Sequence, residues 1–508
     1  MVPGYFGKGH PKMVSLYRPR LFVVLLAGLL FSASLQAEDW PQFRGPNCSG
    51  ISTSTASLPV NFSATENVRW TASLGDGIGS PVVAAGRVFT SEMSADQKSV
   101  ILRGFDASSG TPLWQRAWPT GQLVDVHKTN SHAATTPAAD AERVYFYFST
   151  LGLIAVDAKT GEDRWHLKMP TPYFVFKWGP AMSPVLYKDK VIFCQDDDLF
   201  PAIYAIDKVT GKVAWKDDRN DMAVNYSHPV ICSTASGDEI VVAGTGSLVG
   251  YDPATGERLW KAAVLLRNIK TTPVVRDGVI YISLQSSGIA NQWLATADRS
   301  ETGNSDGKLT KAEMQAFVGE VKIPDSFFAK TFDRGDLDKS GSLEGEELDI
   351  AFLSPDNFAG ARFDDETPGD EYVMAVRGGG RGNVTDSHVL WKHPTKYTDH
   401  IVSPLVTDDR MLLVKGGGIS TSFDIQKGRS LGRPQRIQNT CEYFASPIMG
   451  DDKIYIGGEN GTVVVLANSR KMNILARNDM GDSILATPAI SDGRIFIRTR
   501  SKLICVSE

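Results

Sequence analysis

The chain of 508 residues is poor in cysteine and lacks the short cysteine motifs of common binding sites. No two cysteines are adjacent or separated by two residues, which excludes a zinc ribbon, a thioredoxin-type centre and a c-type haem site. An odd number leaves at least one cysteine without a partner within the chain. We expect these thiols to be small buried side chains in strands. The five are Cys48, Cys194, Cys232, Cys441 and Cys505.

The chain also lacks a basic excess and, beyond its N-terminus, any apolar run long enough to cross a membrane. A net charge of −5 gives no field that would attract nucleic acid. The apolar run Leu21–Phe31 follows four basic side chains and precedes small residues that end at Ala37. This layout is typical of a secretory signal peptide, so we predict export to the periplasm or the cell exterior. The alternative is an uncleaved membrane anchor, for which the run is short.

Motifs of familiar catalytic centres are missing too. The sequence contains no G-x-x-x-x-G-K-[ST], no G-x-S-x-G and no H-E-x-x-H. The glycine-rich segment 377–383 is interpreted as a linker and not as a phosphate loop. No carboxylate pair typical of a glycosidase is recognisable, although spacing alone does not exclude one. The sequence therefore indicates no catalytic residue.

Turn-forming residues are abundant, with 47 glycines and 26 prolines, and many of them recur in one pattern. An Asp is followed three residues later by Thr or Ser, then by Gly, and four residues after the Gly by Trp. The Asp caps nearby backbone N–H groups and the Gly adopts the left-handed conformation, which predicts a tight turn between strands. The Trp then packs from an outer strand onto the neighbouring unit. The copies begin at Asp106, Asp157, Asp207 and Asp252, and a degenerate copy without the Trp begins at Asp424.

A second pattern opens each unit with a small or polar residue, a proline and a short strand. Most steps between these prolines are 41 to 56 residues, which predicts an all-β, eight-bladed β-propeller. The last unit ends without its fourth strand, so we expect the strand at Asn67–Trp70 to complete that blade and close the ring. The prolines are Pro81, Pro137, Pro184, Pro229, Pro273, Pro404, Pro447 and Pro488.

The repeats resemble the Ala-x-Asp-x-x-Thr-Gly-x-x-x-Trp units of secreted PQQ-repeat propellers, of the BamB-like and quinoprotein-like kind. The segment Asp39–Pro46 is similar to the start of many such proteins. Quinoprotein dehydrogenases hold pyrroloquinoline quinone (PQQ) over the channel with a metal ion, a catalytic Asp and, commonly, adjacent cysteines. This chain has no adjacent cysteines, and the metal-binding set of those enzymes matches no positions here. The resemblance therefore implies the fold, and these two departures from the enzymes' pattern disfavour PQQ as a cofactor.

One step, from Pro273 to Pro404, is 131 residues long and contains an insertion in blade 5. We predict a signal peptide at 1–37, an N-terminal arm at 38–66, and the ring-closing strand with blades 1 to 5 at 67–290. The insertion follows at 291–360 and the remaining blades at 361–508. Residues 336–347 match a twelve-residue EF-hand loop that binds calcium through oxygen ligands. The predicted ligands are Asp336, Asp338, Ser340, the carbonyl of Ser342, and Glu347.

A partner loop precedes this one and fits the same pattern less well. Its first position is Thr302, where Asp is expected, so Asp298 or Glu301 would substitute if the loop is expanded. Two interpretations stay open, a weaker second calcium site and an unloaded loop that braces its neighbour. The predicted ligands are Asn304, Asp306, the carbonyl of Lys308, and Glu313.

Polar and aromatic side chains cluster just before the proline-initiated strands, at one end of the ring. They suit a small polar ligand or a peptide loop, which would bind at this rim. The alternative is that they bond buried backbone at the strand starts. The run Asp196–Asp198 is interpreted as a solvated turn. The candidate rim residues are His127, Asn130, His132, Trp178, Tyr226, His228, Lys270, His400 and Tyr443.

Together these patterns predict an exported PQQ-like propeller that acts as a binding or scaffold protein, with calcium bound by an EF-hand pair. A protein or a small polar ligand is the expected partner, and nucleic acid is not. The alternative is a PQQ-dependent dehydrogenase or another secreted enzyme that acts on alcohols or sugars.

Overall fold

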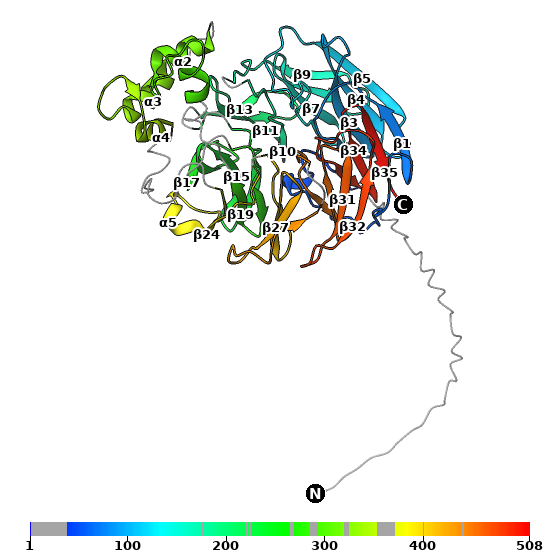
Figure 1. The fold of residues 1–508 in the computed structure, drawn as a ribbon. Helices are drawn as coiled ribbons and strands as arrows, with labels where there is room; N and C mark the ends of the chain where they lie inside the picture. Colours follow the sequence, from blue (N-terminus) through cyan, green and yellow to red (C-terminus); the bar gives the residue numbers. More distant parts are fainter. Residues whose placement is uncertain are drawn as a thin grey trace, which may run out of the picture. The chain divides into compact units, whose positions relative to one another are not determined.

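The proline-initiated repeats fold into sheets of at least four strands in the computed structural model, and eight such sheets form a β-propeller (Figure 1). The structure describes residue 1 and residues 38–508, except 175–176, 220–221, 223–224, 265–268, 285–292, 320–324, 353–370, 400 and 438–440. The predicted signal peptide lies outside these residues. None of the described helices combines the length and apolarity that a membrane crossing requires. The predicted eight-bladed, all-β fold is confirmed.

In each of the first four blades, consecutive strands pair antiparallel, and the first strand is innermost. Blade 1 is β2 (Val82–Ala84), β3 (Arg87–Met93), β4 (Ser99–Asp106) and β5 (Pro112–Pro119). Blade 2 is β6 (Ala138–Ala139), β7 (Arg143–Phe148), β8 (Gly152–Asp157) and β9 (Asp163–Leu167). Blade 3 is β10 (Val185–Tyr187), β11 (Lys190–Gln195), β12 (Ala202–Asp207) and β13 (Val213–Asp218). Blade 4 is β14 (Val230–Thr234), β15 (Gly237–Gly244), β16 (Gly246–Tyr251) and β17 (Arg258–Val264).

The other four blades follow the same plan, and blade 5 is interrupted by the insertion. Blade 5 is β18 (Val274–Arg276), β19 (Val279–Leu284), β22 (Tyr372–Arg377) and β24 (Val389–Pro394). Blade 6 is β25 (Leu405–Val406), β26 (Arg410–Lys415), β27 (Ile419–Asp424) and β28 (Gln435–Arg436). Blade 7 is β29 (Ile448–Gly450), β30 (Lys453–Gly457), β31 (Thr462–Ala467) and β32 (Ile474–Asp479). Blade 8 is β33 (Ala489–Ser491), β34 (Arg494–Arg498), β35 (Lys502–Val506) and β1 (Val68–Ser73).

The ring closes through blade 8, where the two ends of the propeller meet. Strand β1 pairs antiparallel with β35, with Val68 opposite Val506 and Ser73 opposite Lys502. This pairing supplies the fourth strand that the last repeat lacks, so the predicted closure is confirmed. It also removes two free sheet edges that would otherwise be exposed.

Tryptophans join neighbouring blades in the way that the repeat pattern predicts. In blade 1, the indole N–H of Trp114 donates to the carbonyl of Ala158, in the turn of blade 2, at 3.1 Å. Its ring lies against Gly161, where an added Cβ would come within 2.6 Å of the indole. Asp157 caps that turn by accepting from two backbone N–H groups, as expected. The same bond, at 3.0–3.1 Å, is made by Trp70, Trp165, Trp215 and Trp391.

The junction of blades 4 and 5 departs from this rule because the glycine-rich linker between β22 and β24 replaces the turn of blade 5. The indole N–H of Trp260 donates instead to the buried carboxylate of Glu239 in its own blade, at 2.8 Å. The same carboxylate oxygen accepts from the backbone of Gly379 at 3.0 Å. Strand β23 (Gly382–Asn383) of the predicted linker then adds to β17 in parallel, opposite Trp260. A short helix, α5 (Thr385–His388), leads back to β24.

The N-terminal arm follows the inner side of the ring and bonds to seven blades in turn. Its contacts begin at Glu38, whose carbonyl accepts from Ser491 in blade 8, and at Trp40, which bridges to Val83 in blade 1. The arm contains one 3-10 turn, η1 (Pro46–Cys48). The remaining bonds are Pro41 to Ala139, Gln42 to Leu186, Asn47 to Ile231, Arg44 to Pro404, and Gly50 to Met449. The arm therefore spans the channel beneath the inner strands.

The insertion between β19 and β22 is helical and carries its own small sheet. It contains η2 (Leu294–Asp298), β20 (Leu309–Thr310), α2 (Lys311–Val318), α3 (Asp325–Gly335), β21 (Ser342–Leu343) and α4 (Glu346–Phe352). Strands β20 and β21 pair antiparallel, and Leu309 faces Leu343, both fully buried. Figure 1 shows α2, α3 and α4 grouped together.

Three of the five cysteines, Cys194, Cys232 and Cys505, are buried in strands as the sequence analysis expects, whereas Cys48 lies in η1 and Cys441 lies outside the strands. All are free thiols, four are buried and Cys441 is half-buried. Burial raises the pKa of Cys48 to about 12, so its thiol stays protonated. The four buried thiols act as small apolar side chains of the core.

Candidate functional site

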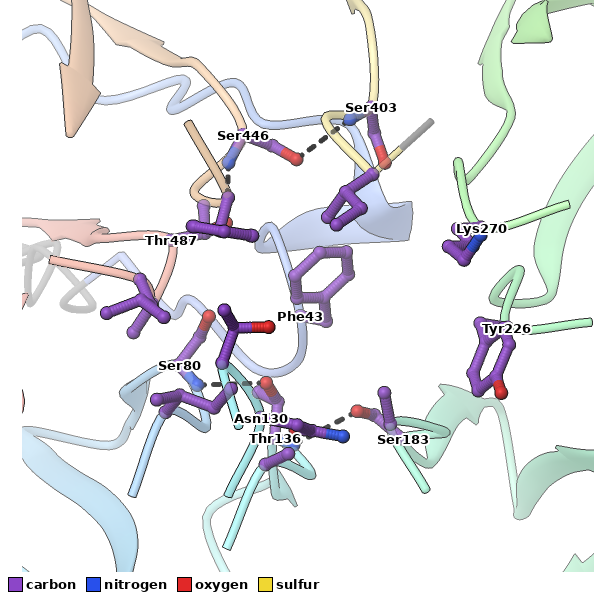
Figure 2. A pocket seen from close by; sticks show the side chains of 18 of the residues that line it. Phe43, Ser80, Asn130, Thr136, Ser183, Tyr226, Lys270, Ser403, Ser446 and Thr487 are labelled. Atoms are coloured by element: carbon purple, nitrogen blue, oxygen red, sulfur yellow. Dashed lines mark hydrogen bonds between the residues drawn. The ribbon is translucent and has the colours of Figure 1, made fainter. Parts of the chain in front are cut away.

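A cavity of about 700 Å³ opens at one end of the channel, where the chain enters the inner strands (Figure 2). Phe43 of the N-terminal arm belongs to its lining and lies near the centre of the view. Most other lining residues are small, aromatic or aliphatic. The titratable side chains of the described lining, tyrosine aside, are His127, His228, Lys270 and Glu442.

A belt of hydroxyl groups joins the blades around this cavity. In six of the blades, the residue before the proline donates its backbone N–H to the hydroxyl of the equivalent residue in the next blade, as Ser80 does to Thr136 at 3.0 Å. Figure 2 shows four of these bonds. The sequence shows a small or polar residue before each proline, but this role was missed because the hydroxyls meet only after the ring closes. The hydroxyl belt comprises Ser80, Thr136, Ser183, Thr272, Ser403, Ser446 and Thr487.

His228 takes the place of the hydroxyl in blade 4. Its imidazole stacks on Phe43 with ring centroids 4.4 Å apart, and its Nδ1 lies 3.0 Å from the hydroxyl of Thr272. Its Nε2 has no hydrogen-bond partner in the described structure. Burial, and then the nearby Arg44 cation, lower the pKa of His228 to about 3. The ring is therefore neutral at physiological pH.

Lys270 supplies the positive charge of the cavity wall. Its ammonium lies 4.0 Å from the ring centroid of Trp178, a cation–π contact. Within the described chain the ammonium forms no ion pair or hydrogen bond. Burial lowers the pKa of Lys270 to about 7, against the opposing effect of Asp399. The carboxylate of Asp399 is itself satisfied by backbone N–H groups, among them those of Ile401 and Gly416.

The structure brings six of the nine predicted rim residues into the cavity lining. These are His127, Asn130, Trp178, Tyr226, His228 and Lys270. His132 and Tyr443 do not line it, and Tyr443 is fully buried. His400 lies outside the described residues. The amide of Asn130 donates to the carbonyl of Trp178 at 2.7 Å, so this residue also does the backbone bonding that the alternative interpretation expects.

The later loop of the insertion gathers its acidic side chains around one point. Carboxylate oxygens of Asp336, Asp338 and Glu347 lie within 4.8 Å of one another. Asp336 accepts from the backbone of Gly341 at 2.9 Å. The hydroxyl of Ser340 lies 3.1 Å from the carbonyl of Ser342. All five predicted oxygen ligands therefore belong to one short, closed loop.

The earlier loop forms a second acidic group, and Asp298 is one of its members. Asp298, Asp306 and Glu313 place carboxylate oxygens within 4.8 Å of one another. Asp298 is fully buried and accepts from the backbone of Asp306 at 3.0 Å and of Gly307 at 3.1 Å. The predicted ligand Asn304 donates to Asp306, and Lys308 forms an ion pair with Glu344 in the later loop at 2.7 Å. Asp298 thus takes the place left open by Thr302.

The prediction of a solvated turn at Asp196–Asp198 is wrong for its first two residues. Asp196 is buried and forms a two-bond ion pair with the fully buried Arg219, at 2.8 and 2.9 Å. Asp197 is also buried and caps the backbone of Tyr173 and Phe200. Burial raises the pKa of Asp197 to about 6. The sequence does not show this because the partners lie up to 24 residues away.

A family model described as outer membrane protein assembly factor BamB matches residues 54–173 and 178–337, more than half of the chain. The chain belongs to the BamB family. An outer membrane protein assembly factor BamB of Shewanella oneidensis is 22% identical over 423 residues, covering 78% of this chain and 88% of that protein. Among solved structures, BamB from Moraxella catarrhalis has a TM-score of 0.48 at 12% identity, covering 86% of this chain and 96% of that one.

This BamB-family chain is also similar, over a short segment, to a quinoprotein. The quinoprotein ethanol dehydrogenase of Pseudomonas aeruginosa is 32% identical over 133 residues, which are 23% of this chain and 20% of that enzyme. Among the described residues, groups of three or more acidic, His or Cys ligands occur only in the two insertion loops. The described cavity lining has a single carboxylate, Glu442, and so does not fit a cofactor held with a metal ion.

Proposed function

We propose that this BamB-family protein is an exported binding scaffold whose insertion holds calcium in a pair of EF-hands. The closed ring gives a rigid platform, because strand β1 seals blade 8 and the N-terminal arm ties seven blades together. Relatives of this chain are named as outer membrane protein assembly factors. By extension, this chain would hold assembly partners near the outer membrane, in the periplasm.

The acidic loops of the insertion carry the calcium part of the proposal. Three carboxylates within 4.8 Å of one another repel each other strongly unless a cation lies between them. Calcium prefers six to eight oxygen ligands in such a loop, and the later loop offers three carboxylates, a hydroxyl and a carbonyl. The paired strands β20 and β21 join the two loops through Leu309 and Leu343, so occupation of one loop orders the other.

Calcium titration of the exported form by isothermal calorimetry tests this proposal. After treatment with a chelator, we expect two ions to bind, with dissociation constants on the order of 10⁻³ M or tighter. Asp336→Asn removes one ion and Asp298→Asn the other. Asp189→Asn, which changes an exposed acid in blade 3 that pairs only with its neighbour Lys190, leaves both. Calcium also raises the thermal stability of the insertion and not that of the ring.

Each outcome of this titration decides a separate point. Uptake of one ion that only Asp336→Asn abolishes would keep the calcium proposal and give the earlier loop a bracing role. Absence of binding at millimolar calcium would contradict the proposal. Collapse of the whole propeller in Asp336→Asn would contradict the independence of insertion and ring.

A further inference from the structure

We propose that the cavity at the channel mouth binds a small organic anion in which a carboxylate is joined to a flat apolar ring. The carboxylate lies at Lys270, and the ring lies over Phe43. This site is independent of the calcium loops, so it stands or falls separately from the proposed scaffold function.

The unpaired charge of Lys270 is the first support. An ammonium inside a cavity normally has an ion pair or hydrogen bonds, because burial of an unpaired charge is costly. Within the described chain Lys270 contacts the face of Trp178 and forms no ion pair or hydrogen bond, and Asp399 acts on it only at longer range. An anion from solution would complete this contact, and burial strengthens the resulting charge-assisted bond.

The charges around the cavity also favour an anion. Arg44 is fully buried and close enough to His228 to lower the pKa of its imidazole. Two of the three guanidinium nitrogens of Arg44 have no described hydrogen-bond partner, so its charge is only partly compensated. On the acidic side, Asp399 is occupied by backbone N–H groups, and Glu442 is exposed.

The shape and lining of the cavity define the rest of the ligand. Phe43 and Trp178 present aromatic surface, and Ile78, Ile401 and Leu485 add aliphatic surface. Figure 2 shows Phe43 between Lys270 on one side and Ser80 and Thr487 of the hydroxyl belt on the other. A volume of about 700 Å³ admits a fused-ring acid with room for ordered water. A flat ring stacks on aromatic side chains, whereas a simple inorganic anion would leave this apolar surface uncovered.

Binding of naphthylacetate and of its neutral amide, naphthylacetamide, tests the proposal. Dissociation constants are measured by ligand-observed NMR on the full exported chain. We expect the acid to bind about tenfold more tightly than the amide, because only the acid pairs with the ammonium. Lys270→Met keeps the apolar stem and removes the charge. The dissociation constant of the acid should therefore rise by about tenfold, while that of the amide stays unchanged. Lys270→Arg restores the preference for the acid.

Lys128→Met is the matched control, because Lys128 is an exposed cation near the same rim that does not line the cavity. It should leave both constants unchanged, and the thermal unfolding of Lys270→Met should match wild type. Equal binding of acid and amide to wild type, or no binding of the acid at millimolar concentration, would overturn the proposal. So would an equal loss in Lys128→Met, which would indicate attraction by surface charge alone. None of these results depends on calcium.

Discussion

The arc of the ring from blade 8 to blade 3 and the arc of blades 4 and 5 are joined by different chemistry. In the first arc, a tryptophan rests on a turn glycine of the next blade, and in blades 1 and 2 a backbone N–H also reaches a hydroxyl of the next blade. In the second arc, Glu239 takes over the indole N–H of Trp260, and His228 replaces the hydroxyl. The first change arises because the glycine-rich linker between β22 and β24 replaces the turn on which Trp260 would rest.

The comparison shows where this chain has departed from its own repeat. Residues outside the repeat pattern then hold the junction, and several of them also meet the cavity. His228 belongs to blade 4, and Lys270 belongs to blade 5, to which the insertion is also attached. The irregular arc therefore contributes the imidazole and the ammonium of the cavity, whose remaining lining comes from most of the other blades.

The largest expected effect is in the regular arc, at the contact of Trp114 with Gly161. Gly161→Ala places a methyl group 2.6 Å from the indole at a φ of +72°. The left-handed backbone costs about 1–2 kcal/mol and the overpacking about 1–3 kcal/mol. We expect the free energy of unfolding to fall by about 3 kcal/mol, measured by denaturant titration.

Gly86→Ala is the matched control for this substitution. Gly86 has nearly the same φ, +73°, but an added Cβ would meet nothing within 4 Å. Its loss should be only the backbone part, about 1 kcal/mol. Equal losses for the two variants would show that the tryptophan contact does not hold the blades together.

The tryptophan contacts of the regular arc could be predicted from the sequence, whereas its bonds to the hydroxyl belt could not. The Asp-x-x-Thr-Gly turn and its Trp are local patterns, and each fixes one contact at a constant step along the chain. Asp157, Gly161 and Trp114 therefore meet as predicted. The acidic loops of the insertion are equally local, and only the position of Asp298 beside Asp306 needed the structure, because Asp298 precedes its loop by several residues.

The irregular arc and the cavity could be predicted only in part. Position before a proline correctly indicated Lys270 and His228, but it gave no sign of what faces them. Phe43 was missed because it lies 185 residues from its stacking partner in the printed sequence, on an arm with no repeat. Glu239 was missed for a related reason, because its partner Gly379 follows the insertion. Such contacts depend on ring closure and not on local pattern.

A smaller effect is expected at the irregular junction. Glu239→Ala leaves the N–H groups of Trp260 and Gly379 without their acceptor. We expect a loss of about 2 kcal/mol in the free energy of unfolding and faster tryptic cleavage at Arg381, because the linker detaches from blade 4. Glu239→Gln keeps an acceptor oxygen and should lose about half as much. The control Glu142→Gln changes an exposed acid and should alter neither quantity.

The smallest expected effect is at His228, where a substitution can restore the hydroxyl that the other blades carry. His228→Ser restores a hydroxyl where the backbone N–H of Ser183 has no partner in the described structure. The new bond contributes about 1 kcal/mol, and the lost stack on Phe43 removes about the same amount. We therefore expect the free energy of unfolding to change by less than about 1 kcal/mol.

A double-mutant cycle with Phe43→Leu separates these two terms. With the stack already removed, His228→Ser should stabilise the protein by about 1 kcal/mol relative to Phe43→Leu alone. The alternative outcome is that His228→Ser lowers the free energy of unfolding by more than 2 kcal/mol in both backgrounds, an amount typical of a disrupted core contact. This would mean that the imidazole stabilises the protein by filling space in the packed interior. In that case a serine could not replace His228 in blade 4, and this departure from the repeat would be needed for folding as well as for binding.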